Sequence, residues 1–342
     1  MAREFYKGPN SYVVYAEDSA FGTAGTPTAS DRIGRIQNAS WTVENNFILS
    51  QGAGEGRDAT TATLGKLDIS GSLSFLIDNF DIFEYFVGEK SGAGLVADPY
   101  QIEEKDFVGY GAGLIPTLTL EFGHEGPATD LTETIDGVYF PSFTINMSQG
   151  EVASCDATFN GRHMDVGSSI VTYTAPTTRP FTFVDGNVTV GSDSAKVKSF
   201  SLTHDAGYST DPEVGSRYIV QPVAGQRRYT FSITMYFTND DTASVLSGKE
   251  MMGLALGGTT ASTSTSDVAE FASAGTLSLD LVEGAASNDR VVNIDLENVF
   301  ITNMSPSVDV GGGAIEATIS GVGFAGLTDG ALKVPIRWYT IA

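Results

Sequence analysis

Two stretches of this chain, 160 residues apart, share one pattern of apolar and polar residues. Residues 65–88 (GKLDISGSLSFLIDNFDIFEYFVG) correspond to residues 225–248 (GQRRYTFSITMYFTNDDTASVLSG). In each copy a glycine precedes a segment with apolar residues on the odd positions and mostly polar residues on the even ones. A repeat of every second residue is typical of a strand with one buried face. The chain is therefore predicted to contain the same structural unit twice.

Each copy also carries the signals of a short helix after this strand. An asparagine stands at the cap position, acidic residues lie in or beside the first turn, and a glycine closes the segment. Cap oxygens and acids favour a helix N-terminus, and glycine favours a C-terminus. The residues are Asn79, Asp81 and Gly88 in the first copy and Asn239, Asp240, Asp241 and Gly248 in the second. These signals predict one short capped helix in each copy.

Shorter matches extend the repeat over most of the chain. The alternating segment from Ser40 (SWTVENN) aligns with the one from Ser199 (SFSLTHD), and near the end of each copy DATFNG at 156–161 aligns with EATISG at 316–321. Long loops are predicted at corresponding places in the two copies. They cover residues 45–64 and 205–224 after the first strand, and 89–115 and 249–274 after the helix.

The matches predict two domains of similar topology, at residues 31–165 and 180–325. Residues 166–179 are predicted to form a linker, 1–30 an N-terminal arm and 326–342 a C-terminal strand-like tail. Either terminal segment could add a strand to its own domain or to a neighbouring subunit. For the N-terminal arm, we expect it to cross a subunit boundary.

The composition favours a mainly β fold. Gly, Ser and Thr are abundant, Phe and Tyr are common, and apolar alternation returns about every ten residues. Few windows could form a long helix. The prediction is two tandem duplicated domains, each a β-sandwich or partly closed barrel with one short α-helix.

The charge balance argues against tight nucleic-acid binding. The chain has 19 basic and 42 acidic residues, a net charge of −23, and no block of Lys or Arg. Three explanations stay open: solubility of a protein that assembles, repulsion of a polyanion that passes close by, and a high-salt habitat. Composition alone does not choose among them.

Residue types that carry chemistry are sparse. Cys155 has acidic neighbours, which favour an inert thiol over a nucleophile. The histidines His124, His163 and His204 lack metal-ligand spacing and are expected to be solvated. The glycine-rich stretch 52–56 does not lead from a strand into a helix as a phosphate loop must. No catalytic site, metal or cofactor is expected, and no apolar run reaches membrane-spanning length.

The opening SYVVYAEDSAFGTAGTPT resembles the start of the tail tube proteins of long-tailed, siphovirus-like phages and archaeal viruses. In that family an aromatic-rich strand precedes the pattern E-x-S-x-F/Y-G-T, and the residues that match it are Glu17, Ser19, Phe21, Gly22 and Thr23. A strand with Trp41, a long loop with Gly56 and Arg57, and the strand and helix from Gly65 are also similar to the family. The resemblance is close over roughly the first ninety residues and architectural over the rest.

The resemblance implies a structural virion protein. Family members form rings whose inner sheets join edge to edge around a channel, and the rings stack through a long loop between the first two strands. Six domains surround the channel in known tubes, so two domains per chain imply homotrimeric rings with pseudo-sixfold symmetry. The implied partners are further copies of the chain, a tape-measure protein, a tail terminator and baseplate or distal tail proteins. Viral DNA would pass through without specific binding, in a tail assembled in the host cytoplasm.

The resemblance also suggests which residues face the neighbouring ring and the channel. The candidate contacts between rings are Arg57, Asp58, Arg217 and Tyr218. The candidate lumen-facing residues are Asp68, Ser70, Ser72, Ser74, Thr230, Ser232 and Thr234. A solvated flexible loop is an equally good interpretation of the first group.

Two other classes of protein share parts of this pattern. A two-domain immunoglobulin-like adhesin or a capsid decoration protein would have the sheets and loops without a matched helix in both copies. A carbohydrate-active sheet enzyme would need acids and aromatics that converge in a cleft. Assembly into tubes would separate the first hypothesis from both.

Overall fold

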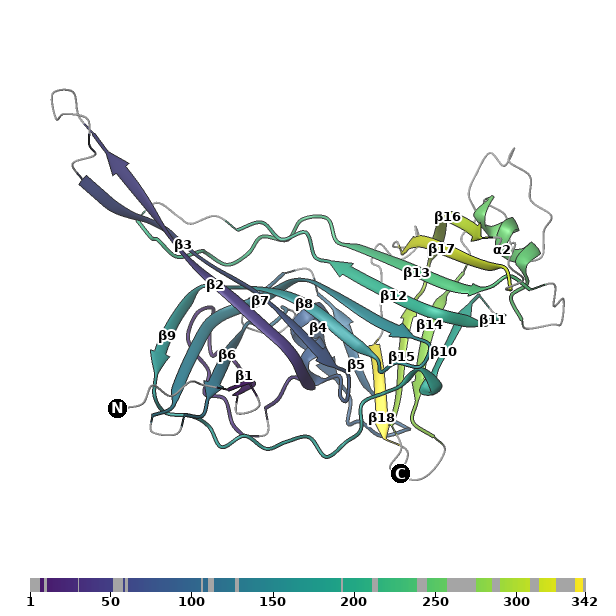
Figure 1. Cartoon of the computed structure of the whole chain (residues 1–342), viewed down its shortest axis with the longest axis horizontal. Coiled ribbons are helices and arrows are strands. Elements are labelled where there is room, and N and C mark those ends of the chain that lie inside the picture. Colours follow the sequence, from purple (N-terminus) through teal and green to yellow (C-terminus); the bar gives the residue numbers. More distant parts are fainter. Residues whose placement is uncertain are drawn as a thin grey trace.

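The computed structural model describes residues 7–8, 11–29, 31–51, 58, 61–105, 107–109, 114–126, 129–191, 193–210, 215–238, 245–256, 275–284, 290–307, 314–323 and 336–340. The molecule is elongated and mainly β, and a long hairpin projects from one end (Figure 1). The predicted fold class is confirmed at this level.

One sheet, which we call the long sheet, runs through the whole molecule. Its main path contains strands in the order β16-β17-β13-β12-β7-β8-β3-β2. Their bounds in chain order are β2 Arg35–Ser50, β3 Thr61–Leu76, β7 Leu131–Ser148, β8 Ser154–Gly161, β12 Val197–Asp205, β13 Arg228–Tyr236, β16 Val299–Ser307 and β17 Glu316–Gly323. Three more strands continue from the first part of β7: β1 Ser11–Glu17, β6 Leu118–His124 and β9 His163–Gly167.

A second sheet, which we call the short sheet, has the order β11-β10-β14-β15-β18-β5-β4. Its strands are β4 Gly88–Ser91, β5 Tyr100–Glu104, β10 Gly186–Val190, β11 Asp193–Ala195, β14 Leu277–Val282, β15 Arg290–Leu296 and β18 Ile336–Thr340. The C-terminal strand β18 lies between β15 and β5. The tail therefore joins strands from the two halves of the chain.

The two halves of the long sheet follow the same strand order. The first half runs β2-β3-β8-β7 and the second runs β12-β13-β17-β16, and β7 joins them by pairing antiparallel with β12. The register of this junction extends from Ser148 opposite Ser199 to Ser142 opposite Asp205. The halves are thus joined by main-chain hydrogen bonds in both sheets.

A single large apolar core extends across both halves. Alternate residues of the long sheet point into it, such as Leu73 and Phe75 on β3 and Ile233 on β13. Beneath the first half, Phe83 and Phe86 pack on Phe143 of β7 at ring distances of 5.5 and 5.1 Å. Aromatic rings of this kind each bury a large apolar area, which stabilises the sheet against the layer below it.

A glycine faces a phenylalanine in each half, with the strands exchanged. Gly71 on β3 lies opposite Phe159 on β8, whereas Phe231 on β13 lies opposite Gly321 on β17. A Cβ atom at Gly71 would lie 2.3 Å from the Phe159 ring, and one at Gly321 would lie 2.3 Å from the Phe231 ring. Each ring therefore fills the space that its glycine leaves open.

Strand pairing corrects part of the sequence alignment. In the alignment of residues 65–88 with residues 225–248, Ser72 corresponds to Ser232. Their partners on the neighbouring strands are Ser40 and Ser201. Ser40 thus corresponds to Ser201 and not to Ser199. In the same way Thr158, the β8 partner of Ser72, corresponds to Ser320 and not to Thr318. Sparse identities on an alternating strand fit equally well after a shift of two residues.

The two helices differ from the prediction. In the first half a 3₁₀ turn, η2 Asp81–Phe83, leads into a single turn of α-helix, α1 Glu84–Val87, without a side-chain cap. In the second half α2 spans Gly248–Ala255, so Gly248 begins the helix that it was predicted to close. The reason is a capping box, in which Ser247 and Glu250 each bond the other's backbone N–H. Asn239, Asp240 and Asp241 lie outside the described residues.

Several predicted loops and terminal segments are also structured. Strands β2 and β3 extend far into 45–64, and 89–115 contains β4 and β5. Residues 11–17 of the predicted N-terminal arm form β1, which pairs with β6 of the same chain. This segment does not cross a subunit boundary, because Val13 and Val14 are buried in the chain's own core.

The predicted linker lies along the first half instead of hanging free. The Val171 N–H donates to the Tyr12 hydroxyl at 2.6 Å, and the Arg35 guanidinium donates to the Thr178 carbonyl at 2.8 Å. The Tyr173 ring stacks on the Tyr12 ring at 5.6 Å. Hydrogen bonds and ring packing thus fix the path by which the chain enters the second half.

Candidate functional site

The long sheet presents one continuous polar face opposite the core. On β3 and β13 the buried residues alternate with all seven residues predicted to line a channel, and none of these seven is buried. They are Asp68, Ser70, Ser72, Ser74, Thr230, Ser232 and Thr234. The structure brings them onto one face of one sheet. Whether that face surrounds a channel depends on assembly.

Short hydroxyl side chains pair with one another across this face. The hydroxyl oxygens of Ser40 and Ser72 lie 2.9 Å apart, those of Ser142 and Thr158 lie 2.7 Å apart, and those of Thr234 and Thr318 lie 3.2 Å apart. Thr144 and Thr203 lie 3.0 Å apart across the junction of the two halves. Cross-strand hydroxyl pairs stabilise a sheet modestly, and they occupy each other's donors and acceptors.

One row of residues shows how uniform the face is. Asn146, Ser201, Ser232, Ser320 and Asn303 lie opposite one another on five successive strands, from β7 to β16. All five side chains are small, polar and uncharged. The row crosses the junction between the halves without a change of character, so in this respect the two halves present the same surface.

The charged groups on the face are mostly paired. The Lys66 ammonium lies 2.7 Å from the Asp68 carboxylate, and the Lys198 ammonium lies 2.7 Å from the Glu316 carboxylate. Asp156 accepts a hydrogen bond from the Asn146 amide at 3.0 Å. A polyanion that approaches the described part of this face would meet mainly hydroxyls and acids, and both Lys66 and Lys198 are paired with carboxylates.

The long sheet ends in two open edges. Strands β2 and β16 lie at the ends of the path, and within the described residues each pairs with one strand only. Most of β2 is exposed, as are Asn303, Ser305, Pro306 and Ser307 on β16. An open edge is a template for pairing with another strand, and proteins that keep one commonly use it in assembly.

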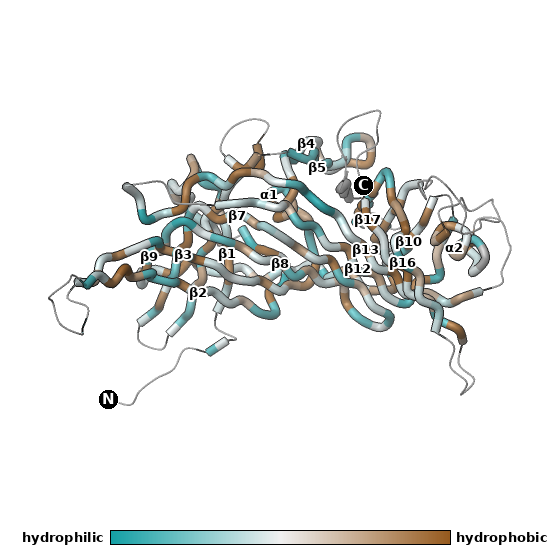
Figure 2. The backbone as a smooth tube through the Cα atoms, turned by 90° about the horizontal axis from the view of Figure 1, so that it is seen from above, coloured by the Kyte–Doolittle hydropathy of each residue, from teal (hydrophilic) through white to brown (hydrophobic). Residues whose placement is uncertain are grey.

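The β2–β3 hairpin extends beyond the body of the molecule, and we call residues 45–51 and 61–65 the arm (Figure 1). Phe47, Ile48, Leu49 and Leu64 are exposed by 54–67%. Figure 2 shows hydrophobic stretches of backbone at the end of the molecule where β3 is labelled. Of the two contact residues predicted in the sequence between β2 and β3, Asp58 is exposed and Arg57 lies outside the described residues.

In the corresponding loop of the second half, residues 206–227, the described residues 206–210 and 215–227 fold back onto their own chain. The backbones of Ser209 and Val223 exchange hydrogen bonds of 3.0 and 2.9 Å. The Arg217 carbonyl accepts from the Leu67 N–H at 2.9 Å, and its guanidinium donates to Asn45. The Tyr218 ring lies 5.7 Å from the Arg162 guanidinium. Arg217 and Tyr218 thus contact the base of the arm.

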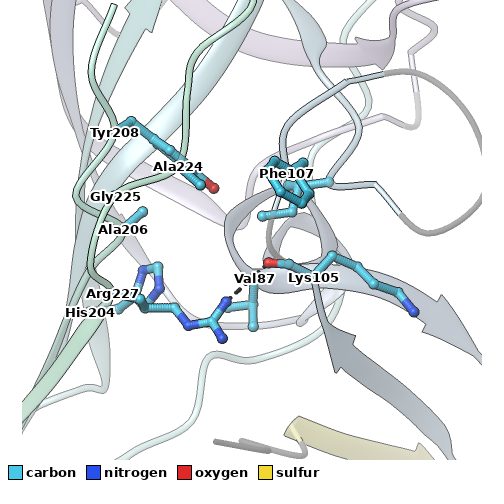
Figure 3. A pocket seen from close by; sticks show the side chains of 10 residues that line it. Val87, Lys105, Phe107, His204, Ala206, Tyr208, Ala224, Gly225 and Arg227 are labelled. Atoms are coloured by element: carbon cyan, nitrogen blue, oxygen red, sulfur yellow. Dashed lines mark hydrogen bonds between the residues drawn. The ribbon is translucent and has the colours of Figure 1, made fainter. Parts of the chain in front are cut away.

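A cavity of about 330 Å³ lies between the two halves beside this loop (Figure 3). Val87 and Phe107 line it from the first half, and His204 and Tyr208 line it from the second. The Arg227 guanidinium donates to the Lys105 carbonyl at 3.0 Å and contacts the Glu104 carboxylate at 2.6 Å. The cation is therefore engaged in holding the halves together.

His204 departs from the prediction of a solvated side chain. Only 1% of it is exposed, and neither ring nitrogen has a hydrogen-bond partner. Its ring lies 5.1 Å from Phe143 and 4.7 Å from Tyr229. Burial, and secondarily the charge of Arg227, lowers the pKa of His204 to about 3. The ring is therefore neutral at pH 7 and packs as a flat aromatic group.

The remaining chemistry-bearing residues have structural surroundings. Cys155 is fully buried, and burial raises the pKa of its thiol well above the usual value. His124 lies 2.8 Å from the Ser11 hydroxyl, and His163 lies 3.3 Å from the Asp136 carboxylate. Across the described ranges, no three His, Cys, Asp or Glu side chains gather as a metal site would require. The two α-helices among them are too short to cross a membrane.

The open edges, the arm and the polar face together describe a protein built to associate, and comparison with known families agrees. A family model described as phage tail tube protein matches residues 8–323. The chain belongs to this family. No curated protein matches the sequence. Membership confirms the resemblance found at residues 11–28 and supports a structural role in the virion tail. It favours that role over the adhesin, decoration-protein and carbohydrate-enzyme alternatives.

Proposed function

We propose that three copies of this chain close into a ring and that stacked rings form the tube through which viral DNA leaves the particle. The observation that carries the proposal is the β7–β12 junction. It joins the last strand of one four-stranded unit to the first strand of the next by a regular antiparallel ladder. The open edges β16 and β2 occupy the same two places in their own units.

Repeating the junction between copies would close the sheet. The last strand of one chain, β16, would pair with β2 of the next chain as β7 pairs with β12 within a chain. This arrangement removes both open edges and makes the interface head to tail. Such an interface forms a ring when the rotations between successive units add up to one full turn. Six equivalent junctions, three within chains and three between them, fit the trimeric ring implied by the family. The tandem duplication would then supply two units per chain.

The junction predicts a specific register between copies. Ser72 and Ser232 hold corresponding places in the two halves. Their partners on β8 and β17, Thr158 and Ser320, therefore correspond as well. The next partners along the sheet, Ser142 on β7 and Asn303 on β16, correspond in turn. Two residues further along, Thr144 corresponds to Ser305. On β12 and β2, Thr203 corresponds to Thr42. Because Thr144 faces Thr203, Ser305 of one copy should face Thr42 of the next.

Cysteine cross-linking tests this register. The double variant Thr42→Cys with Ser305→Cys should form disulfides between copies under mild oxidation, since directly opposed residues lie within disulfide reach. The largest covalent species on a denaturing gel should be a trimer. The matched control moves one cysteine four residues along the strand, as Asn38→Cys with Ser305→Cys, and should not cross-link. A ladder that continues to hexamers would contradict the trimer, and equal cross-linking of the control would contradict the register. The native Cys155 is buried, so it should not contribute to the cross-linking.

The polar face supports the conduit part of the proposal. A channel lined by small hydroxyls, acids and lysines that are paired with acids offers DNA little net attraction, so the polymer can slide. Ser72→Lys or Ser232→Lys would add one cation per chain to that face. Each variant should make tubes retain labelled DNA, with binding that falls as salt is raised. Retention of DNA by the unaltered tubes at physiological salt would contradict a non-binding lumen.

Tail tube proteins associate with other tail proteins, and we propose for this chain the partners that the family resemblance implies. Further copies of the chain form the rings, a tape-measure protein occupies the lumen during assembly, and a tail terminator and baseplate or distal tail proteins end the tube. Arg57 and Asp58, in the sequence between β2 and β3, stay candidates for contact with the next ring. Assembly in the host cytoplasm belongs to the same proposal.

A further inference from the structure

We infer that rings of this protein stack through the arm of the first half alone, and that the 206–227 loop of the second half braces the arm at its base. The inference rests on the proposed function and concerns which of the two corresponding hairpins meets the next ring. Its occupant is a second copy of this chain. The tube would then have six similar units around its lumen but only three contacts of this kind between one ring and the next.

The arm has the surface of an unfilled interface. Phe47 and Leu64 lie directly opposite each other on the two strands, and both are more than half exposed. Ile48 and Leu49 follow at 62% and 67% exposure. Contiguous exposed apolar side chains on an otherwise polar protein mark a site of association. The β-ladder holds them at a fixed place away from the body (Figure 1).

The charge of the arm points to another copy as the partner. Residues 45–51 (NNFILSQ) and 61–65 (TATLG) contain no charged side chain, in a chain with 61 charged residues and a net charge of −23. Two such chains repel each other over most of their surfaces. The two uncharged strands of the arm can approach a second acidic copy with little repulsion, and the sequence between them adds one basic residue, Arg57, to the acids Glu55 and Asp58.

The described residues of the 206–227 loop contact the first half of the same chain. The Arg217 carbonyl and guanidinium bind Leu67 and Asn45, which face each other at the base of the arm. Ile219 is 4% exposed and packs with Val108, Ile115 and Tyr139. With this backbone and Ile219 engaged in this way, the described part of the loop is held against its own chain.

The position of the brace explains what it does. Asn45 and Leu67 form the last regular pair before a register shift between Asn45 and Phe47. A register shift bends a ladder and weakens its control of direction. Contact from Arg217 at this pair, together with the Tyr218 ring against Arg162 and 5.5 Å from His163, fixes the direction in which the arm leaves the sheet.

Assembly of variants tests the inference. The triple variant Phe47→Ser, Ile48→Ser, Leu49→Ser keeps the length of the arm and should raise the concentration needed for tubes at least tenfold in electron micrographs and sedimentation. Arg217→Ala with Tyr218→Ala should raise it several-fold, because the arm loses its fixed direction. The matched controls Val223→Ser on the loop and Val184→Ser on the body remove valines that are 61% and 88% exposed, and neither should change assembly.

The outcomes separate this inference from the proposed function. Each variant is made in the Thr42→Cys, Ser305→Cys background, where the covalent trimer reports ring formation and correct folding. Trimers without tubes in the arm variant support the inference. Tubes at the parental concentration would overturn it, as would a Val223→Ser effect equal to that of the arm variant. Absence of the covalent trimer in the parent would instead contradict the proposed ring.

Discussion

The hairpins β2–β3 and β12–β13 hold the same place in the strand order, yet they end differently. Each strand of the first has 16 residues and each strand of the second has nine. The longer hairpin leaves the body as the arm, and the shorter one ends in a loop that folds onto the base of that arm. Strand order and the polar face are common to both halves, whereas the hairpin ends have diverged. We attribute the difference to the contacts in the proposed tube. The polar faces of both halves would line the same channel, whereas one hairpin end would meet the next ring and the other meets its own chain.

The exchanged Gly and Phe residues show the same freedom inside the core. Gly71 with Phe159 and Phe231 with Gly321 place one ring over one glycine in each half, on opposite strands. The sheet requires a total volume at this pair of positions and is indifferent to which strand supplies it. This is the behaviour of a core that tolerates substitution when volume is conserved.

The largest expected effect comes from removing one of these rings. Phe159→Ala should lower the free energy of unfolding by about 3–5 kcal/mol, because it loses buried apolar contact and leaves a cavity beside Gly71. Phe231→Ala should have an effect of similar size, since both rings are buried. Denaturant unfolding monitored by circular dichroism measures both. A cost below about 1 kcal/mol in either half would show that the pair is not a core element there.

The exchange itself can be tested by converting the first half to the arrangement of the second. Gly71→Phe alone should be severely destabilising, because a Cβ there would lie 2.3 Å from the Phe159 ring. Gly71→Phe combined with Phe159→Gly should recover part of the loss, and the double variant should be more stable than the sum of the single changes. Strict additivity would contradict the compensation.

His204 predicts a difference in acid sensitivity between the halves. Its pKa is lowered to about 3 in the folded protein and is near the ordinary value of 6.5 in the unfolded chain. The unfolded state therefore binds a proton first, and stability is lost as the pH falls below about 6.5. The slope from this one residue is up to about 1.4 kcal/mol per pH unit, down to the folded pKa.

Replacing the ring isolates that contribution. His204→Phe keeps a flat aromatic group against Phe143 and removes the titrating nitrogens, so the free energy of unfolding should depend less on pH between 6.5 and 4. The corresponding position in the first half is Val43, where no histidine titrates. An unchanged pH profile in the variant would assign acid sensitivity to the carboxylates instead.

The smallest expected effect distinguishes the two helix starts. Ser247→Ala removes a capping box and should lower the free energy of unfolding by about 1 kcal/mol. Asn79→Ala should lower it by a few tenths at most, because Asn79 accepts a 3.3 Å bond from the Asp81 N–H, donates to the adjacent Asp78 carboxylate at 3.1 Å, and caps no α-helix. Thermal unfolding of the two variants gives the comparison. Equal losses would show that Asn79 stabilises η2 as a cap.

Much of the surface proposed to line the channel could be predicted from sequence. The alternation on β3 and β13 identifies which side chains share the polar face, since neighbours along a strand point to opposite sides. The arm could not be predicted as strand, because NNFILS around Phe47 has consecutive apolar residues and no buried face to impose a period. The same holds for α2, where the predicted cap at Asn239 outweighed the S-x-x-E signature that begins at Ser247.

The sequence by itself determined the β class, the family and the division of each strand into a core side and a polar side, because these follow from side-chain chemistry and a period of two. Only the tertiary structure decided which strands meet: β7 with β12, β18 between β15 and β5, and β1 within its own chain. It also decided that one hairpin extends and the other folds back. Strands pair through backbone N–H and C=O groups that are the same in nearly every residue, so the choice of partner depends on the packing of the whole chain.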